Sequence, residues 1–450
     1  MTEHASSQPS MAKVMWATVL GNVMQWYDFI IYGQAAALIL NELFFPSFSP
    51  VAGTLAAFAT YAVGFLARPI GGIIFGHLGD RRGRKPVLVI TLVMMGASTF
   101  LIGLLPTYAM AGWLAPALLV TLRMVQGLGA GAEYAGAVVF SIEHAPGRRG
   151  FYGGLISGAN FMALVLATGV FVLISALPQD ALASWGWRVP FLISIVIVAT
   201  SLYIRLKLTE TPMFEQMSSD DAQKTMPIVG VFRHYRKELV IACGAGFFLE
   251  GGAYIYQVFL LSYVVSELHL PESTALIALL IAATIGIFTM PMFGALSDHV
   301  GGRSVYLSGA AFSALFAFPF FWMVDTRQPW LITIAVILGL SVGAAAMFGT
   351  LPAFYSEMFS TQFRYSGVVL ARELTGAFVG GPTPFIAAAL VALVGGSPWP
   401  VALFMMVTAL IPFIAVLFAH ETGHSDFDSH REQATRIEPA SSPATVKTEE

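Results

Sequence analysis

Two things are scarce in this 450-residue chain: cysteine and charge. The single cysteine, Cys243, lies in an apolar stretch, so it forms no disulfide within the chain and has no companion ligands for a zinc site. Charged residues make up 11% of the chain, whereas 56% is hydrophobic and the mean hydropathy is +0.74. A soluble globular domain of this composition would precipitate, so we expect the bilayer to be the main solvent. The net charge of −3, with basic residues scattered over short loops, indicates no nucleic-acid partner.

Apolar stretches broken by proline, glycine and charge predict twelve membrane-spanning helices, because a helix needs about 20 mainly apolar residues to cross a bilayer. Six are expected at residues 14–40, 51–76, 87–105, 112–137, 150–176 and 189–205. Six more are expected at residues 238–264, 273–296, 304–324, 330–356, 365–393 and 400–420. The first apolar segment is far longer than the core of a signal peptide, so we expect it to be an uncleaved span.

The two halves of the sequence repeat each other. The run GHLGD at residues 76–80 recurs as GALSD at residues 294–298. The predicted fold class is therefore an all-α integral membrane protein, with twelve transmembrane helices in two six-helix bundles. The predicted domains are an N-terminus (1–13), an N-terminal bundle (14–205), a linker (206–237), a C-terminal bundle (238–420) and a disordered tail (421–450).

Basic residues predict the orientation of the chain, because short loops rich in Lys and Arg stay on the cytoplasmic side. The run GHLGDRRGRKP at residues 76–86 lies between two apolar stretches. Outside the spans, Arg188 and Arg327 alone fall in loops of the opposite side. We therefore expect a multi-pass protein of the bacterial inner membrane, with both termini and the linker in the cytoplasm.

Several of these motifs resemble one family. GHLGDRRGRK resembles the signature of the loop between helices 2 and 3 of the major facilitator superfamily, and Arg123–Gly129 resembles its fourth-helix signature. Within that superfamily, Gly21–Gly33, Phe65–Gly72 and the run GAGAEYAGA around Glu133 resemble the metabolite:proton symporters, particularly the shikimate-type permeases. The resemblance covers all but the ends of the chain and implies the major facilitator fold. One position departs from the family pattern, because Gln25 stands where an acidic residue is usual.

Ionisable residues inside the predicted spans are candidates for function, because a charge at the bilayer centre costs roughly 2.5–3.5 kcal/mol on insertion scales. Arg68, Arg123 and Glu250 fall near the middle of their spans. An arginine keeps its proton, and its planar fork matches a carboxylate, so Arg68 and Arg123 are candidates for binding an anionic substrate. The alternative is a permanent pair with a protein carboxylate. For Arg123 the best internal partner is Asp28, and for Arg68 we favour a structural or gating role.

Two helical faces carry polar stripes at i, i+4, i+7 spacing. The first span has Gly21, Gln25, Asp28 and Tyr32, and the seventh has Glu250, Tyr254 and Gln257. We expect these stripes to line a cavity and to contribute to substrate binding. The alternatives are hydrogen bonds between helices for Gln25 and Tyr32, and for Glu250 an ion pair with Arg372 in a kinked packing helix.

Arg372 and Glu373 are neighbours in the eleventh span, so their side chains point about 100° apart and one can face a cavity while the other packs sideways. We include Arg372 among the expected substrate-binding residues. The shikimate-type permeases that the chain resembles carry uncharged residues here, so we expect a different substrate specificity.

Proton coupling requires a group whose protonation changes during transport. None of the nine histidines lies deep in a predicted span, so the carrier is expected to be a carboxylate. Asp28 and Glu133 are the first candidates, and Glu250 and Glu373 follow. For Glu133 the alternative is a structural contact with the arginines of the loop between helices 4 and 5.

The basic loop after the second span has two expected roles. It sets the orientation of the chain in the membrane, and it contributes to a cytoplasmic gate. Asp80 can accept hydrogen bonds from a helix N-terminus and from Arg84, and such bonds break as the two halves rock. The family resemblance implies the same role. The expected cytoplasmic gate comprises Gly76, Asp80, Arg81, Gly83, Arg84, Asp298 and Arg303.

These residues together favour a secondary active transporter that imports a small organic acid by proton symport through alternating access. The alternatives are a proton symporter for zwitterionic osmolytes such as proline or betaine, and a proton-driven drug exporter. The tail lacks the apolar heptads of osmosensing relatives. An enzyme would need a nucleophile–base pair or a metal cluster, and no such spacing occurs in the sequence. The expected partners are a small carboxylate and the lipid bilayer, with the proton as coupling ion, no cofactor, no metal, and a functional monomer.

Overall fold

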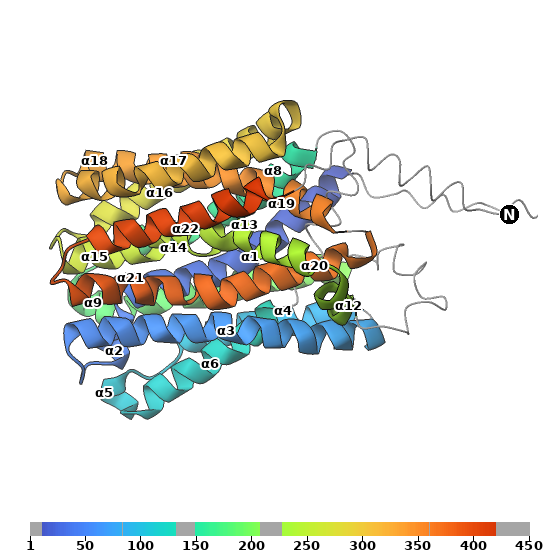
Figure 1. Ribbon diagram of the computed structural model, residues 1–450. Coiled ribbons are helices and arrows are strands. Elements are labelled where there is room, and N and C mark those ends of the chain that lie inside the picture. Colours follow the sequence, from blue (N-terminus) through green and yellow to red (C-terminus); the bar gives the residue numbers. More distant parts are fainter. Residues whose placement is uncertain (1–10, 83, 132–148, 208–226, 360, 420–450) are drawn as a thin grey trace, which may run out of the picture.

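The computed structural model describes residues 11–82, 84–131, 149–207, 227–359 and 361–419. Within these residues the chain is helical and contains no strand. The long helices run side by side along one common direction (Figure 1), while the short helices α2, α5 and α9 lie at one end. The predicted fold class is therefore confirmed.

The N-terminal bundle consists of six long helices. These are α1 (Met11–Leu38), α3 (Pro50–Arg82), α4 (Arg84–Gly103), α6 (Leu114–Ala130), α8 (Arg149–Ser175) and α10 (Val189–Lys207). Short elements connect them, namely α2 (Leu40–Phe44), α5 (Tyr108–Ala111), α9 (Gln179–Ser184) and the 3₁₀ turn η1 (Gly186–Arg188).

The C-terminal bundle also has six spans, preceded by the short helix α12 (Pro227–His234). Three spans are continuous: α16 (Glu272–Val300), α17 (Gly302–Asp325) and α22 (Trp399–Leu417). The other three spans each contain a π-helical turn. The seventh span consists of α13 (Arg236–Glu250), α14 (Gly252–Tyr254), the π turn η2 (Ile255–Phe259) and α15 (Leu260–Ser266). The tenth consists of α18 (Pro329–Val336), the π turn η3 (Ile337–Ala344) and α19 (Ala345–Met358), and the eleventh of α20 (Thr361–Thr375), the π turn η4 (Gly376–Gly380) and α21 (Pro382–Leu393). Such turns often occur at functional sites.

Length and apolar composition explain why these segments are helical. Eight of the described helices are long enough to cross a membrane, and their most apolar windows have mean hydropathies of 1.5–2.4. Three shorter apolar helices lie at Val89–Gly103, Leu114–Ala130 and Gly186–Thr200, and α1 has 28 residues. A helix satisfies its backbone N–H and C=O groups by internal hydrogen bonds, which is necessary because the hydrocarbon of the bilayer offers no hydrogen-bond partners.

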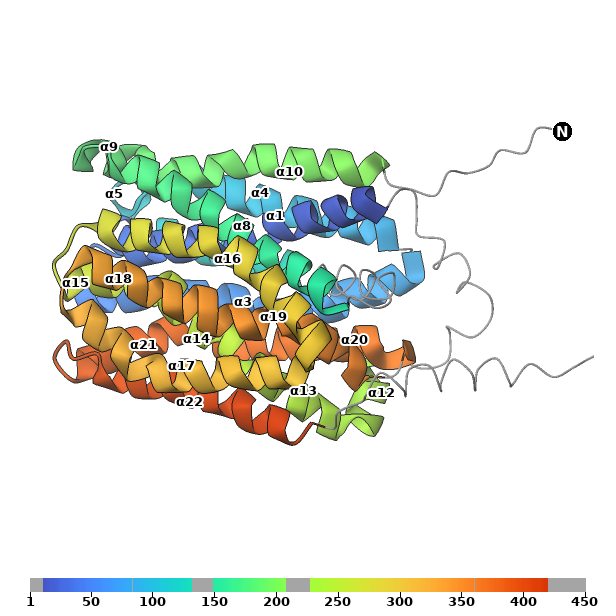
Figure 2. The same cartoon turned by 90° about the horizontal axis from the view of Figure 1, so that it is seen from above.

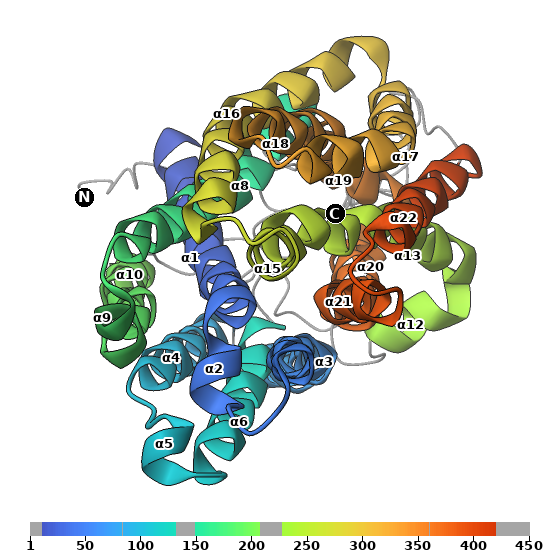
Figure 3. The same ribbon diagram turned by 90° about the vertical axis from the view of Figure 1, so that its left-hand side faces the viewer.

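The two bundles meet along several helix pairs, in which α8 and α3 of the first bundle have the largest share. Figures 2 and 3 show α8 beside α16, and Figure 3 shows α3 beside α21. At the first pair the backbones nearly touch, because a Cβ atom added to Gly150 would lie 2.2 Å from the carbonyl oxygen of Gly294. Two of the residues that the sequence singles out, Arg68 and Glu373, meet at this interface between the bundles.

Candidate functional site

Arg68 and Glu373 form an ion pair that joins the two bundles. Arg68 lies on α3, and its Nε donates to Glu373 Oε2 on α20 over 2.8 Å, while its Nη2 donates to Glu373 Oε1 over 2.9 Å. Both side chains are buried. Two parallel hydrogen bonds of this kind are the strongest arrangement that an arginine and a carboxylate form. The pairing agrees with a structural or gating role for Arg68.

Arg372 and Glu250 form a second buried pair, within the C-terminal bundle. Arg372 Nε donates to Glu250 Oε1 over 3.1 Å, and its guanidinium lies 4.9 Å from the ring centre of Trp26 on α1. Glu250 Oε2 has no hydrogen-bond partner among the described residues. The ion pair expected as the alternative for Glu250 is therefore present.

The two pairs adjoin each other at Gly376, the first residue of η4. A Cβ atom at this glycine would lie 3.4 Å from Glu250 Oε2 and 3.8 Å from Arg68 Nη1. We call Arg68, Glu250, Arg372 and Glu373 the charge cluster. Two cations and two anions give it no net charge, which is the arrangement that burial of charge requires.

Arg123 lies deeper in the N-terminal bundle and is fully buried. It donates to Gln126 Oε1 and, over 3.3 Å, to the carbonyl oxygen of Tyr61, and its guanidinium lies 3.9 Å from the ring centre of Tyr32. Neutral acceptors and an aromatic face contribute to stabilising this cation. Its pairing with Asp28 stays a prediction.

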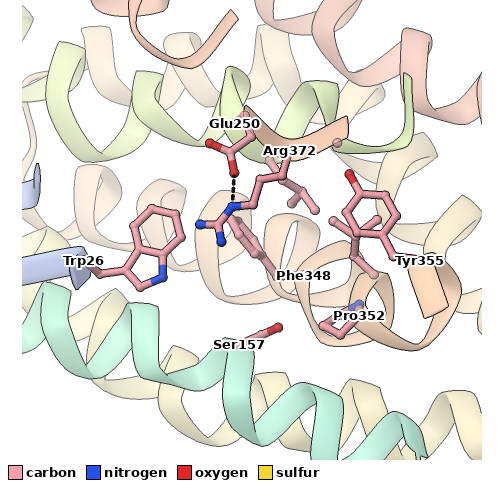
Figure 4. Close-up of a pocket in the computed structure, with 10 residues that line it drawn as sticks. Trp26, Ser157, Glu250, Phe348, Pro352, Tyr355 and Arg372 are labelled. Atoms are coloured by element: carbon pink, nitrogen blue, oxygen red, sulfur yellow. Dashed lines mark hydrogen bonds and ion pairs between the residues drawn. The ribbon is translucent and has the colours of Figure 1, made fainter. Parts of the chain in front are cut away.

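A small cavity opens beside Arg372 (Figure 4). Its lining residues are Trp26, Ser157, Gly246, Leu249, Glu250, Phe348, Leu351, Pro352, Tyr355 and Arg372. Its volume is about 20 Å³, enough for about one water molecule. The cavity as it stands is therefore too small for an organic acid, which needs a wider opening between the helices to bind here.

The polar stripe of the first span makes contacts between helices. Gln25 Nε2 donates to the carbonyl oxygen of Ala130 over 3.2 Å, and the hydroxyl of Tyr32 lies 2.5 Å from that of Thr60. Asp28 is buried on the same helix. Gln25 and Tyr32 thus hold α1 against α6 and α3 in this state, and their role in binding a substrate stays a prediction.

The stripe of the seventh span is interrupted. Tyr254 and Gln257 are buried, but the helix breaks at Gly251, and η2 changes the helical repeat after Tyr254. Of this stripe, Glu250 alone lines the cavity. The prediction that Tyr254 and Gln257 bind substrate remains untested.

The cavity has aromatic walls that charge-based reasoning missed. Trp26, Phe348 and Tyr355 line it, together with Ser157. Trp26 follows Gln25 directly, so its place in a polar stretch of the first span was the available signal. Phe348 and Tyr355 resemble the other aromatic residues of the apolar spans, and the sequence offers no sign of their position.

At the end of the bundles where α8 begins, Asp298 contacts the opposite bundle. Its Oδ1 accepts from the backbone N–H of Gly150 over 2.7 Å, and its Oδ2 accepts from that of Phe151 over 3.0 Å. A carboxylate at this position caps the helix and complements its dipole. Arg303 donates instead to the carbonyl oxygen of Leu417, over 2.8 Å and within its own bundle.

Other gate and coupling candidates cannot be compared with these contacts. Gly83 and Glu133, and the side chains of Asp80, Arg81 and Arg84, lie outside the described residues, as do most of the predicted linker and the tail. Gly76 is described within α3, where an added Cβ atom would meet nothing that the structure describes within 4 Å. Among the described residues, no group of three or more His, Cys, Asp or Glu side chains is arranged to hold a metal ion.

We expect Asp298→Ala to favour opening at the end where α8 begins. The change removes both acceptors of the cap, and such caps contribute about 1 kcal/mol, which is a roughly fivefold change in an equilibrium. Labelling by an impermeant maleimide at Ser157→Cys, in a Cys243→Ala background, measures access to the cavity. Asp298→Asn keeps an acceptor oxygen and should show a smaller increase, and equal labelling of all three proteins would contradict the prediction.

Comparison with known proteins agrees with this geometry. A sequence model described as the Major Facilitator Superfamily matches residues 18–381. The chain is 40% identical to the shikimate transporter of Escherichia coli over 408 residues, which cover 89% of this chain and 93% of that protein. It is 36% identical to the proline/betaine transporter of Escherichia coli over 447 residues, which cover 96% and 87%. A crystal structure of a D-xylose-proton symporter superposes with a TM-score of 0.70 and 19% identity, over 91% of this chain and 97% of that one.

Proposed function

Because the chain belongs to the Major Facilitator Superfamily, we propose that it imports a small organic carboxylate together with a proton, by alternating access between its two bundles. It is a multi-pass membrane transporter and not an enzyme. Its similarity to a shikimate transporter supports a carboxylate, since shikimate is the anion of a carboxylic acid.

The position of Arg372 carries the proposal. It is the arginine that lines the cavity, and its guanidinium fork matches a carboxylate geometrically and electrically. The Trp26 ring lies beside the guanidinium and also lines the cavity (Figure 4), so a ring or hydrocarbon portion of a substrate has an apolar surface to pack on. Pockets for small molecules commonly combine apolar walls with a few polar groups of this kind.

The charge balance of the cluster supports coupling to a proton. With two cations and two anions it is neutral, so one bound carboxylate adds a net negative charge inside the membrane. Uncompensated charge in this environment is costly, and a proton on one carboxylate of the cluster restores neutrality. One proton per carboxylate is the stoichiometry that this balance favours. Asp28 and Glu133 remain alternative carriers of the proton.

The distribution of basic residues supports a location in the cell membrane with both termini in the cytoplasm. The end at which α8 begins is then the cytoplasmic end, where Asp298 holds the bundles together. The cavity and the charge cluster lie within one chain, which supports function as a monomer.

Uptake into proteoliposomes tests the proposal. The panel comprises radiolabelled shikimate, other cyclic and hydroxylated monocarboxylates, dicarboxylates, proline and betaine, each with and without an inwardly directed proton gradient. We expect the gradient to drive accumulation of at least one carboxylate, and a protonophore to abolish it. Protein-free liposomes are the control. Accumulation of none of the acids would overturn the proposal.

A zwitterionic osmolyte is the second candidate, and the cavity supplies a reason for it. Trp26, Phe348 and Tyr355 offer aromatic faces, and Glu250 offers a negative charge, beside the cation of Arg372. Aromatic faces attract quaternary ammonium groups while an arginine binds the carboxylate of the same molecule. The similarity to the proline/betaine transporter agrees with this reading. Gradient-driven uptake of betaine or proline without any simple acid would establish it.

A further inference from the structure

We propose that Glu373 carries the coupling proton and that its ion pair with Arg68 locks the two bundles together until this proton arrives, while a bound substrate carboxylate then balances the charge of Arg68. The inference rests on the proposed symport function and assigns one step of it. It follows from where the partners of each ion pair belong in the fold.

The two ion pairs of the charge cluster differ in the bundles to which their partners belong. Arg372 and Glu250 both belong to the C-terminal bundle, so rocking of one bundle against the other leaves this pair intact. Arg68 belongs to the N-terminal bundle and Glu373 to the C-terminal bundle. A motion that parts α3 from α20 must therefore break the Arg68–Glu373 pair, which we call the cross-bundle pair.

Breaking the cross-bundle pair as ions is unfavourable. Both side chains are buried, and separation would leave two charges without partners in a medium of low dielectric constant. A proton on Glu373 removes the negative charge and with it the ionic attraction. Arg68 keeps its own charge because a guanidinium does not deprotonate in proteins. The proton therefore releases Glu373 but leaves a cation that needs an anion.

A substrate carboxylate at Arg372 is close enough to serve Arg68. A Cβ atom added at Gly376 would lie within 4 Å of both Glu250 Oε2 and Arg68 Nη1, so the Arg372–Glu250 pair borders the cross-bundle pair. Arg68 is held there by two aromatic rings, with its guanidinium 5.2 Å from the centre of Phe29 and 5.1 Å from that of Phe65. A proton on Glu373 and a carboxylate between Arg372 and Arg68 keep the cluster neutral, whereas either one alone does not.

Among the ionisable groups of the charge cluster, Glu373 is the one whose charge must change during transport. Arg68 donates to Glu373 from α3, and Arg372 precedes Glu373 on α20. Glu250 on α13 and Tyr254 on α14 lie near the same Arg68. The arginines stay charged. Glu250 need not release Arg372 during rocking, so it has no need of a proton. Cys243 on α13 contacts the backbone of α20 at Ala371, outside the cluster.

Access to the cavity from the cytoplasmic side tests the lock without any substrate. The chain has one cysteine, so Cys243→Ala gives a cysteine-free background in which Ser157→Cys reports on the cavity. In inside-out vesicles we expect Glu373→Gln to raise the rate of labelling by an impermeant maleimide about tenfold, within the range typical of linked equilibria. Acidification should raise the labelling rate of the reporter protein that retains Glu373. The rate of Glu373→Gln at the same pH values should change less, since glutamine already mimics the protonated acid.

Two further variants separate the lock from a general loss of structure. Glu373→Asp keeps the ionisable group and should retain slow, pH-dependent labelling. The exchange Arg68→Glu with Glu373→Arg rebuilds an ion pair across the bundles and should slow labelling toward the original rate. Fast labelling of the exchanged protein, or an unchanged rate in Glu373→Gln, would overturn the lock.

Transport tests the coupling. In proteoliposomes we expect Glu373→Gln to lose accumulation driven by a proton gradient but to keep exchange of labelled for unlabelled carboxylate. Asp298→Ala is the matched control, because it weakens another contact between the bundles and should keep the gradient dependence. Gradient-driven accumulation by Glu373→Gln would overturn Glu373 as the proton carrier. If the original protein moves no carboxylate at all, the proposed function fails, while the labelling experiment still decides the lock.

Discussion

Replacing Arg372 with alanine is expected to abolish concentrative uptake of the carboxylate. Arg372 is the cation at the wall of the cavity, and truncating one partner of a buried, hydrogen-bonded charge pair costs about 2–5 kcal/mol. That corresponds to a loss of apparent affinity of about 30-fold to a few thousandfold. The measurement is the concentration dependence of initial uptake rates in proteoliposomes that contain equal amounts of folded protein.

Arg372→Ala also leaves Glu250 buried without its partner, which on its own could impair folding. The double variant Arg372→Ala with Glu250→Gln removes that stray charge, so it should recover folded protein without recovering uptake. Arg372→Lys keeps the charge but lacks the planar fork, and we expect intermediate affinity. Normal uptake by Arg372→Ala together with lost uptake by Arg123→Ala would move the carboxylate site to Arg123.

Hydropathy predicted the spans well because the bilayer imposes a simple rule on length. The second span was expected at residues 51–76 and occurs as Pro50–Arg82, and the eighth was expected at 273–296 and occurs as Glu272–Val300. The ends differ because helices continue past the hydrocarbon, where hydropathy carries no signal. The π-helical turns were not predicted, although Gly251 and the run Gly380–Pro384 marked two of the breaks.

The charged residues of the site were recognisable from the sequence, but their partners were not. Burial cost singles out Arg68, Glu250, Arg372 and Glu373 regardless of how the helices pack. Arg68 and Glu373 are 305 residues apart and meet only because α3 packs against the eleventh span. No sequence pattern indicated that Gln126 and the carbonyl oxygen of Tyr61 would contact the guanidinium of Arg123, and the pairing of Arg123 with Asp28 stays a prediction.

Patterns of small residues in the sequence mark the close helix contacts only in part. The pairs Gly72–Gly76 and Gly154–Gly158 fit the small-xxx-small pattern, yet within the described residues an added Cβ atom at Gly76 meets nothing within 4 Å. Gly154 does pack tightly, because an added Cβ atom there would lie 2.7 Å from the carbonyl oxygen of Met290. Spacing shows which residues share a face of one helix, but the face that meets a neighbour depends on the arrangement of the whole bundle.

The tightest of these contacts lies between α3 and α6, and it predicts a strong effect on stability. A Cβ atom at Gly127 would lie 2.0 Å from the carbonyl oxygen of Gly64, and one at Gly131 would lie 1.9 Å from that of Arg68. Because the obstacle is backbone, Gly127→Ala must push the helices apart, and overpacking of this kind costs about 3 kcal/mol or more. We expect a large fall in the yield and thermal stability of folded protein in detergent, measured by size-exclusion chromatography after heating.

Gly169→Ala is the matched control, because it makes the same chemical change in α8, where an added Cβ atom meets no described atom within 4 Å. Alanine is a better helix former than glycine by about 0.5–1 kcal/mol, so this variant should be as stable as the original protein or slightly more stable. Equal stability of the two variants would mean that α3 and α6 are not in backbone contact. If Gly127→Ala can be purified, we also expect it to lose uptake, since the contact that it disturbs holds the segments of α3 and α6 that carry Arg68 and Arg123.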